Sequence, residues 1–252
     1  MDSPQSVPTA GEPSYRGWLP EVEVRLTGHD PIDISNYPGR FIVLEGTDGT
    51  GRSTQIALLR EWLETEGFGV IHTGLTRGRL TGEGLKKAKA GTTLGQLTLD
   101  LFYATDFADR LENEILPALR AGFVVLTDRH VWSIMARSIV RGMDPEWLRD
   151  LYRFAPTPHA VLYLKVGTEN LIPRVLARRS FDYWESGMDF QEESDLYRSF
   201  VRYQGRLLKV FDQLAEREGF IVIDANREID KVFADLKLHI GGVVREMKGA
   251  PA

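Results

Sequence analysis

The sequence predicts an α/β protein in which helices cover both faces of one parallel sheet, an arrangement described as doubly wound. Five short apolar runs support this prediction, at residues 41–44, 69–71, 123–126, 160–164 and 220–223. The runs are rich in β-branched residues and do not alternate with polar ones, which is typical of strands buried on both faces. Stretches with helical spacing separate them, and such alternation of strand and helix indicates a doubly wound sheet.

Four helices are predicted between these strands. The first has apolar residues at 56, 59 and 63 and ends at Gly67, and the second runs from residue 97 to 115, before Pro117 and Gly122. In the third, Asp144 is the expected N-cap and Pro145 the first helical residue, a position that needs no N–H group. The fourth is a long helix with apolar residues between 196 and 214.

The composition of the chain excludes several kinds of chemistry. The 252 residues include 31 basic and 36 acidic ones, for a net charge of −5, and no cysteine. Disulfides, thiolate nucleophiles and thiolate metal sites are therefore excluded, and the acidic balance argues against a broad basic surface for nucleic acid. Because the sequence has neither the apolar core of a secretory signal nor an apolar run of membrane-spanning length, we expect a soluble, cytoplasmic protein that binds neither nucleic acid nor membranes.

Residues 1–40 are predicted to form an N-terminal extension, and residues 41–245 the regular domain. Six of the twelve prolines fall in the first 40 residues, which is typical of a segment outside the packed core. Within it, Val22, Val24 and Leu26 alternate with charged residues, and this pattern predicts a short half-buried strand.

A glycine-rich phosphate loop is predicted where the first strand ends and the first helix begins. Its sequence has the spacing of a P-loop, with arginine where lysine is usual. Glycines let backbone N–H groups approach phosphate oxygens, and the start of the helix adds its positive end. Of its residues, Ser53 is expected to bind Mg²⁺ and Arg52 to contact the β- and γ-phosphates. The residues expected to bind phosphate are Gly46, Thr47, Gly49, Thr50, Gly51, Arg52, Ser53 and Thr54.

Arg52 leaves two interpretations of this loop open. A lysine ammonium is compact and fits inside a P-loop, whereas a guanidinium is larger, planar and bidentate. Either the loop accommodates the guanidinium and catalysis persists, or the protein binds nucleotide with little turnover.

A second candidate element is Asp128-Arg129-His130, at the end of the third apolar run. Ligands bind at the carboxyl ends of parallel strands, and an aspartate there binds Mg²⁺ in P-loop enzymes. An isolated Asp-Arg pair is usually a surface ion pair. Its place after a P-loop and a buried strand favours the interpretation of Asp128 as a metal ligand.

Together these residues resemble the thymidylate kinase family. The resemblance spans residues 41 to about 240 and implies an adenylate-kinase-like P-loop fold, a three-layer sandwich. It also implies transfer of the ATP γ-phosphate, with Mg²⁺, to a nucleoside monophosphate, with dTMP as the first candidate, and a homodimer with residues 104–115 as the candidate contact surface. The motifs that support it are residues 41–55, Pro117-Ala118-Leu119, Asp128-Arg129-His130 with Ser133 and Ala136, and Ile223-Asp224-Ala225.

By position, the resemblance assigns roles to individual residues. Asp48 and Arg129 are expected to be catalytic and to contact the acceptor, with Ser133 beside them. Arg77 matches a second acceptor-phosphate arginine, although the Glu-Pro-Gly-Gly stretch that often follows it in the family is missing.

The resemblance also implies a lid at about residues 174–195. Arg174 is expected to bind ATP, and Arg178 and Arg179 to neutralise the transferring phosphoryl group together with Arg52. Residues 181–195, which follow these arginines, are acidic and hold no basic residue.

The acceptor pocket departs from the family pattern. Tyr103 falls at the aromatic position that stacks on thymine. Phe107 stands in place of a base-binding arginine, Ile134 in place of an asparagine, and Arg137 in place of a tyrosine near the deoxyribose. Because lost hydrogen-bond donors weaken discrimination between bases, a kinase of the same fold with a different nucleotide or small-molecule acceptor stays open as an alternative to dTMP phosphorylation. Arg52 and the acidic lid leave a second alternative open, a non-catalytic nucleotide-binding protein.

Overall fold

The computed structural model describes residues 30–247, apart from 79, 92–93, 178–183, 185 and 192–194. Its centre is a five-stranded sheet in the order β2-β3-β1-β4-β5, in which every pairing is parallel. The sheet confirms the predicted doubly wound α/β class. The strands are β1 Arg40–Glu45, β2 Val70–Gly74, β3 Val124–Asp128, β4 Ala160–Lys165 and β5 Ile221–Asp224.

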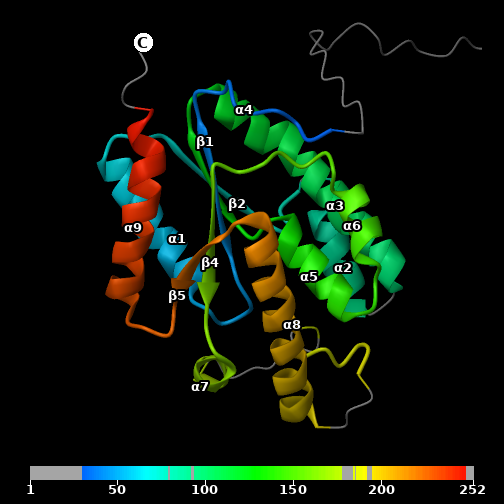
Figure 1. Cartoon of the computed structure of the whole chain (residues 1–252). Helices are drawn as coiled ribbons and strands as arrows, with labels where there is room; N and C mark the ends of the chain where they lie inside the picture. Colours follow the sequence, from blue (N-terminus) through cyan, green and yellow to red (C-terminus); the bar gives the residue numbers. More distant parts are fainter. Residues whose placement is uncertain are drawn as a thin grey trace, which may run out of the picture.

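Helices cover both faces of this sheet (Figure 1). α1 (Arg52–Thr65) and α9 (Ile229–Arg245) lie on one side, and α3 (Gln96–Arg110) and α5 (Val131–Val140) lie on the other. Within the described ranges, none of the helices is both long and apolar enough to cross a membrane. The other helical segments are α2 Gly82–Gly91, a π-helical turn Leu111–Ile115, α4 Leu116–Arg120, α6 Pro145–Leu151, α7 Thr168–Ala177 and α8 Leu196–Glu218.

The central strand β1 contributes side chains to the hydrophobic cores on both faces of the sheet. Phe41, Ile42, Val43 and Leu44 are all fully buried. Because successive side chains of a strand point to opposite faces, Ile42 and Leu44 pack with residues of α1 and α9, whereas Phe41 and Val43 pack with residues of α3 and α5. Burial on both faces explains why the sequence of this strand shows no alternation, and it completes the expected three layers.

The predicted helices are confirmed, with one irregularity that was not predicted. Asp144 caps α6 as expected, with its side chain accepting from the N–H groups of Glu146 and Trp147. The second predicted helix continues through a π-helical turn, in which the N–H of Leu116 donates to the carbonyl of Leu111. This turn places Pro117 at the start of α4, where the missing N–H is tolerated. α5 and α9 were not predicted. α5 packs against α3, α6 and α8 and buries polar residues as well as apolar ones, Ser133 and Ser138 among them. The sequence of α9 does carry a regular apolar stripe, at residues 232, 236, 240 and 244, which sequence reasoning overlooked.

The end of the proline-rich segment packs on the domain. Ile34 is buried, and the N–H of Ile32 donates to the carbonyl of Phe154 at 3.3 Å. The predicted strand with Val22, Val24 and Leu26 lies outside the described residues.

His130 is an unusual core residue at the N-cap of α5. Its ring packs against Phe41, Phe107 and Trp132. Neither ring nitrogen has a hydrogen-bond partner in the described part of the chain. Burial therefore lowers the pKa of this histidine to about 3, because the charged form loses its hydration.

This burial predicts a pH dependence of stability. Between the unfolded pKa of 6.5 and the folded value of about 3, the unfolded chain binds one more proton than the native protein. Lowering the pH through this interval should therefore destabilise the native protein by about 1.4 kcal/mol per pH unit from this group alone. In urea unfolding between pH 7.5 and 4.5, wild-type protein should lose more stability than His130→Phe. If the stability of the two proteins falls equally with pH, the pH dependence does not come from His130.

Candidate active site

The phosphate loop connects β1 to α1 as predicted, and two of its glycines are required by the geometry. Gly46 and Gly49 have φ values of +147° and +84°, which favour glycine. A Cβ at Gly46 would lie 2.9 Å from the carbonyl oxygen of Leu164, and one at Gly49 would lie 2.9 Å from Val175 Cγ2. Gly51 is the N-cap of α1 and gives the helix no side-chain cap, an arrangement that suits an anion at the N-terminus.

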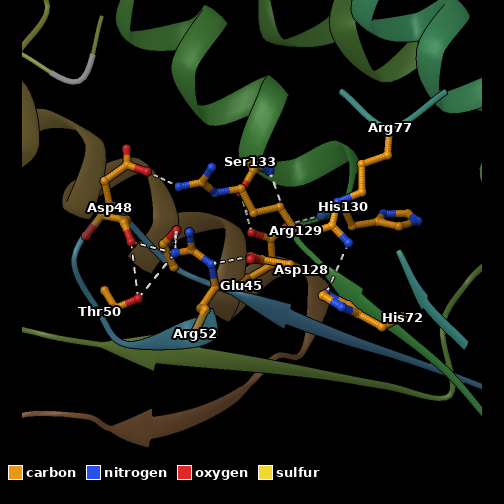
Figure 2. Close-up of polar contacts among 12 residues, drawn as sticks. Glu45, Asp48, Thr50, Arg52, His72, Arg77, Asp128, Arg129, His130 and Ser133 are labelled. Carbon is orange, nitrogen blue, oxygen red and sulfur yellow. Dashed lines mark hydrogen bonds and ion pairs between the residues drawn. The ribbon is translucent and has the colours of Figure 1, made fainter. Parts of the chain in front are cut away.

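Arg52 occupies the inside of this loop, and Figure 2 shows its guanidinium between the loop backbone and Asp128. Its Nη1 donates to the carbonyl oxygens of Gly46 and Thr47, each at 2.5 Å, and its Nε donates to Asp128 Oδ1 at 2.7 Å. The residue is only 7% exposed. The loop thus accommodates the larger guanidinium. The second terminal nitrogen, Nη2, donates to none of the described residues.

Asp48 links the phosphate loop to two arginines that follow β3. Its two carboxylate oxygens accept from Arg129 Nη2 and, at 2.8 Å, from Arg137 Nη2. Arg129 has a left-handed backbone, with φ of +72°, and its N–H donates to the carbonyl of Leu44 at 3.0 Å. These residues come from the ends of neighbouring strands, because Leu44 is paired with Asp128 in the sheet.

A buried glutamate supports the same turn. Glu45, the last residue of β1, accepts from the N–H groups of His130 and Ser133 at 2.8 and 3.2 Å, and from Ser133 Oγ at 2.5 Å. Burial raises the pKa of Glu45, and these hydrogen bonds partly oppose the shift. Ser133, which was expected to contact the acceptor, is itself fully buried and bound to Glu45.

Several of the residues predicted to bind the acceptor meet in one cavity beside the loop. Asp48, Arg129 and Arg137 provide charge there, and Tyr103 and Ile134 provide ring and apolar surface. The complete lining is Asp48, Leu75, Thr76, Gln96, Leu99, Asp100, Tyr103, Arg129, Ile134, Arg137, Ser138, Arg141 and Trp184.

Besides Ser133, two predicted acceptor residues, Phe107 and Arg77, lie outside this cavity lining. Phe107 is fully buried, and its ring packs against His130 and Tyr152 rather than in the cavity lining. Arg77 Nη1 lies 3.4 Å from His72 Nε2, and Arg77 lines a small separate cavity with Asp109 and other charged residues.

Sequence reasoning missed a polar group on the cavity wall. Asp100 Oδ1 accepts from Ser138 Oγ at 2.5 Å and from Gln96 Nε2 at 2.8 Å. Asp100 Oδ2 has no hydrogen-bond partner in the described part of the chain, and burial raises the pKa of this carboxyl. The signal in the sequence is an aspartate one helical turn before Tyr103, on a face that is otherwise apolar.

A second cavity lies on the other side of the loop. Gly51 and Thr54 line it together with Arg174, whose Nη2 donates to the carbonyl of Ala225 at 2.9 Å. Ser53 is exposed in the first turn of α1. Arg178 and Arg179 lie outside the described residues. The complete lining is Gly49, Thr50, Gly51, Thr54, Gln55, Arg174, Ala225, Arg227, Glu228, Ile229 and Val232.

Part of the acidic segment after α7 has a structural partner. Asp189 forms a two-point ion pair with Arg141, at 2.7 Å to Nε and 3.0 Å to Nη2. Arg141 also donates to Tyr203 OH at 2.8 Å and to the carbonyl of Trp184 at 3.2 Å. These bonds attach the segment to α5 and α8 and hold it beside the first cavity.

Comparisons with known proteins find similar sequences over most of the described residues. A family model described as thymidylate kinase matches residues 44–236. A probable thymidylate kinase 2 of Saccharolobus solfataricus is 38% identical over 205 residues, which cover 81% of this chain and 96% of the relative. A probable thymidylate kinase of Pyrococcus abyssi is 35% identical over 204 residues, covering 79% and 94%. A thymidylate kinase of Akkermansia muciniphila is 39% identical over 153 residues, covering 59% and 72%.

The buried contact between Arg141 and Asp189 predicts that Asp189→Asn lowers the free energy of unfolding much more than a matched change at an exposed ion pair. The side chains of this pair are 6% and 12% exposed, and removing one partner of such a buried pair costs about 3 kcal/mol or more. We expect Asp189→Asn to lower the free energy of unfolding by about this amount in urea titrations. Asp212→Asn, which removes the exposed pair with Lys165, should cost about 0–1 kcal/mol. Equal effects would contradict the structural role of Asp189.

Proposed function

The chain belongs to the thymidylate kinase family, and on this premise we propose that it transfers the γ-phosphate of ATP, with Mg²⁺, to dTMP. The observation that carries the proposal is the position of two cavities on opposite sides of one phosphate loop. One is lined by the loop glycines and Arg174, and the other by Asp48, two arginines and a tyrosine. This arrangement suits a donor nucleotide and an acceptor nucleotide whose phosphates meet at the loop.

On the donor side, the loop and the start of α1 bind the ATP phosphates. The uncapped N-terminus of α1 attracts phosphate oxygens. Arg52 keeps one terminal nitrogen on the loop carbonyls and presents Nη2 to the β- and γ-phosphates. A guanidinium can thus combine support of the loop with charge on the donor.

On the acceptor side, the charged end of the cavity suits the monophosphate. Arg129 and Arg137 bind the oxygens of the monophosphate. The phosphate therefore competes with Asp48 for these two arginines. Tyr103 stacks on the base, and Ile134 adds an apolar wall. Asp100, held by Gln96 and Ser138, is a polar group at the base end.

Ser53 and Asp128 fit Mg²⁺, which binds nucleotide phosphates through only one or two protein oxygens. When bound, the ion neutralises charge on the β- and γ-phosphates. An oxygen of the acceptor phosphate then forms a bond to the γ-phosphorus, and the bond to the β-phosphate oxygen breaks to release ADP. Arg52, Arg129 and the lid arginines Arg178 and Arg179 stabilise the charge of this transfer.

We also propose a homodimer, as the resemblance implies. Within 104–115, Ala104, Leu111 and Ile115 are buried in the protein's own core. The apolar side chains that α3 exposes lie one turn earlier, at Leu97, Leu101 and Phe102. Light scattering would test the assembly.

A second candidate is a kinase of the same fold with another acceptor. It is favoured by the cavity itself, in which Ile134 offers no hydrogen bond and Phe107 does not line the wall. A coupled ADP-release screen over deoxynucleoside monophosphates, ribonucleoside monophosphates and nucleosides distinguishes this second candidate from dTMP phosphorylation. We expect the highest kcat/KM with dTMP; a higher value with another acceptor would replace dTMP by that compound.

Substitutions of Arg52 test the donor side. Because the loop already accommodates the guanidinium, Arg52→Lys should change kcat by less than about threefold, whereas Arg52→Met should lower it by about 100-fold or more, as removal of a preorganised charge does. Arg60→Met, an exposed position on the same helix, is the matched control and should be neutral. A large gain in Arg52→Lys would indicate an impaired native loop, and ATP binding without turnover on any acceptor would support the non-catalytic alternative.

Tyr103→Ala tests the acceptor side. Loss of stacking on the base costs about 1–3 kcal/mol, so the KM for dTMP should rise by about tenfold or more while the KM for ATP stays within about twofold. Tyr197→Ala, an exposed tyrosine on α8, should leave both unchanged. An unchanged KM for dTMP in Tyr103→Ala would remove Tyr103 from the acceptor site.

A further inference from the structure

Glu45 occupies a position that the proposed chemistry does not use. It precedes the first glycine of the phosphate loop, yet Figure 2 shows its side chain directed toward the turn that follows β3. Its exposed fraction is 0%, and it lines neither of the two cavities described above. It therefore does not touch either substrate.

The contacts of this carboxylate converge on the start of α5. The N–H groups of His130 and Ser133 and the hydroxyl of Ser133 all donate to it, at 2.5–3.2 Å. A negative group at a helix N-terminus is also favoured by the helix dipole. Burying a carboxylate is unfavourable unless donors replace its water, so these three donors must stay in place for the side chain to remain there.

The residue between these contacts and β3 is Arg129, whose backbone is left-handed. For an arginine this conformation is strained and persists only where the surroundings hold it. Two anchors from β1 do so. The carbonyl of Leu44 accepts from the N–H of Arg129 itself, and Glu45 accepts from the N–H of the next residue, His130.

We propose that Glu45 is a positioning residue, which holds the turn at Asp128, Arg129 and His130 so that the guanidinium of Arg129 faces the acceptor phosphate. Because Glu45 is joined directly to Gly46, it also keeps the donor loop and the acceptor arginine in one fixed relation. The inference rests on the proposed kinase function for its effect on turnover, but not for its effect on the turn.

The first test is kinetic. Glu45→Gln keeps the size of the side chain but removes the charge and turns one acceptor atom into a donor that faces the N–H groups. We expect the KM for dTMP to rise at least tenfold and kcat to fall, while the Kd for ATP, measured by calorimetry, changes less than threefold. Ser133→Ala, which removes one of the three bonds and leaves the charge, should give a smaller shift in the same direction.

Ile240→Val is the matched control for lost stability alone. Ile240 is fully buried in the core on the other face of the sheet, and this change lowers the melting temperature by removing one buried methyl group. It should leave the KM for dTMP unchanged. If Glu45→Gln lowers the melting temperature but leaves the KM for dTMP unchanged, as in this control, Glu45 has only a structural role and the proposal is wrong.

A second readout does not depend on the kinase reaction. Hydrogen exchange at the amides of residues 130 and 133 should accelerate at least tenfold in Glu45→Gln, and exchange in α9 should not change. If wild-type protein turns over no acceptor, the proposed function fails, and this exchange measurement still decides the inference. Unchanged protection at both amides would overturn it, and so would an equal loss of protection throughout the protein.

Discussion

The site depends on the parallel pairing of β1 with β3. The register sets Leu44 opposite Asp128, although the two are far apart in sequence. Because both strands run in the same direction, both end at the same edge of the sheet, and the phosphate loop leaves β1 where the Asp128-Arg129-His130 turn leaves β3. Two ion pairs of the proposed centre, Arg52 with Asp128 and Asp48 with Arg129, join the segment that follows β1 to the carboxyl end of β3 and the turn after it.

Three arginines of the site share two carboxylates. Arg52 is paired with Asp128, and Asp48 is shared by Arg129 and Arg137. The net charge of −5 therefore says little about the cleft, where arginines gather beside the loop. In the proposed reaction, the phosphate groups would compete for arginines that already have carboxylate partners, and Mg²⁺ at Asp128 would compete with Arg52.

Local patterns predicted the sheet and the loop well, because buried parallel strands and a glycine-rich turn leave signals in short stretches of sequence. α5 and α9 were missed. α5 buries serines together with its apolar residues, which obscures its pattern, whereas α9 has a regular apolar stripe that was overlooked. The π-helical turn before Pro117 depends on packing that no local pattern reports. The family resemblance located Asp48, Arg129 and Tyr103, which meet in one cavity. It could not locate Asp100 or the orientation of Phe107, because the wall of a pocket is formed by segments that only tertiary packing brings together.

The acceptor cavity has a consequence for the design of inhibitors. Asp100 Oδ2 has no hydrogen-bond partner in the described part of the chain. Asp100 lines the same cavity as Ile134, which stands where the family resemblance implies an asparagine. A compound that places an apolar group against Ile134 and a polar group toward the wall at Asp100 would complement both features of this cavity.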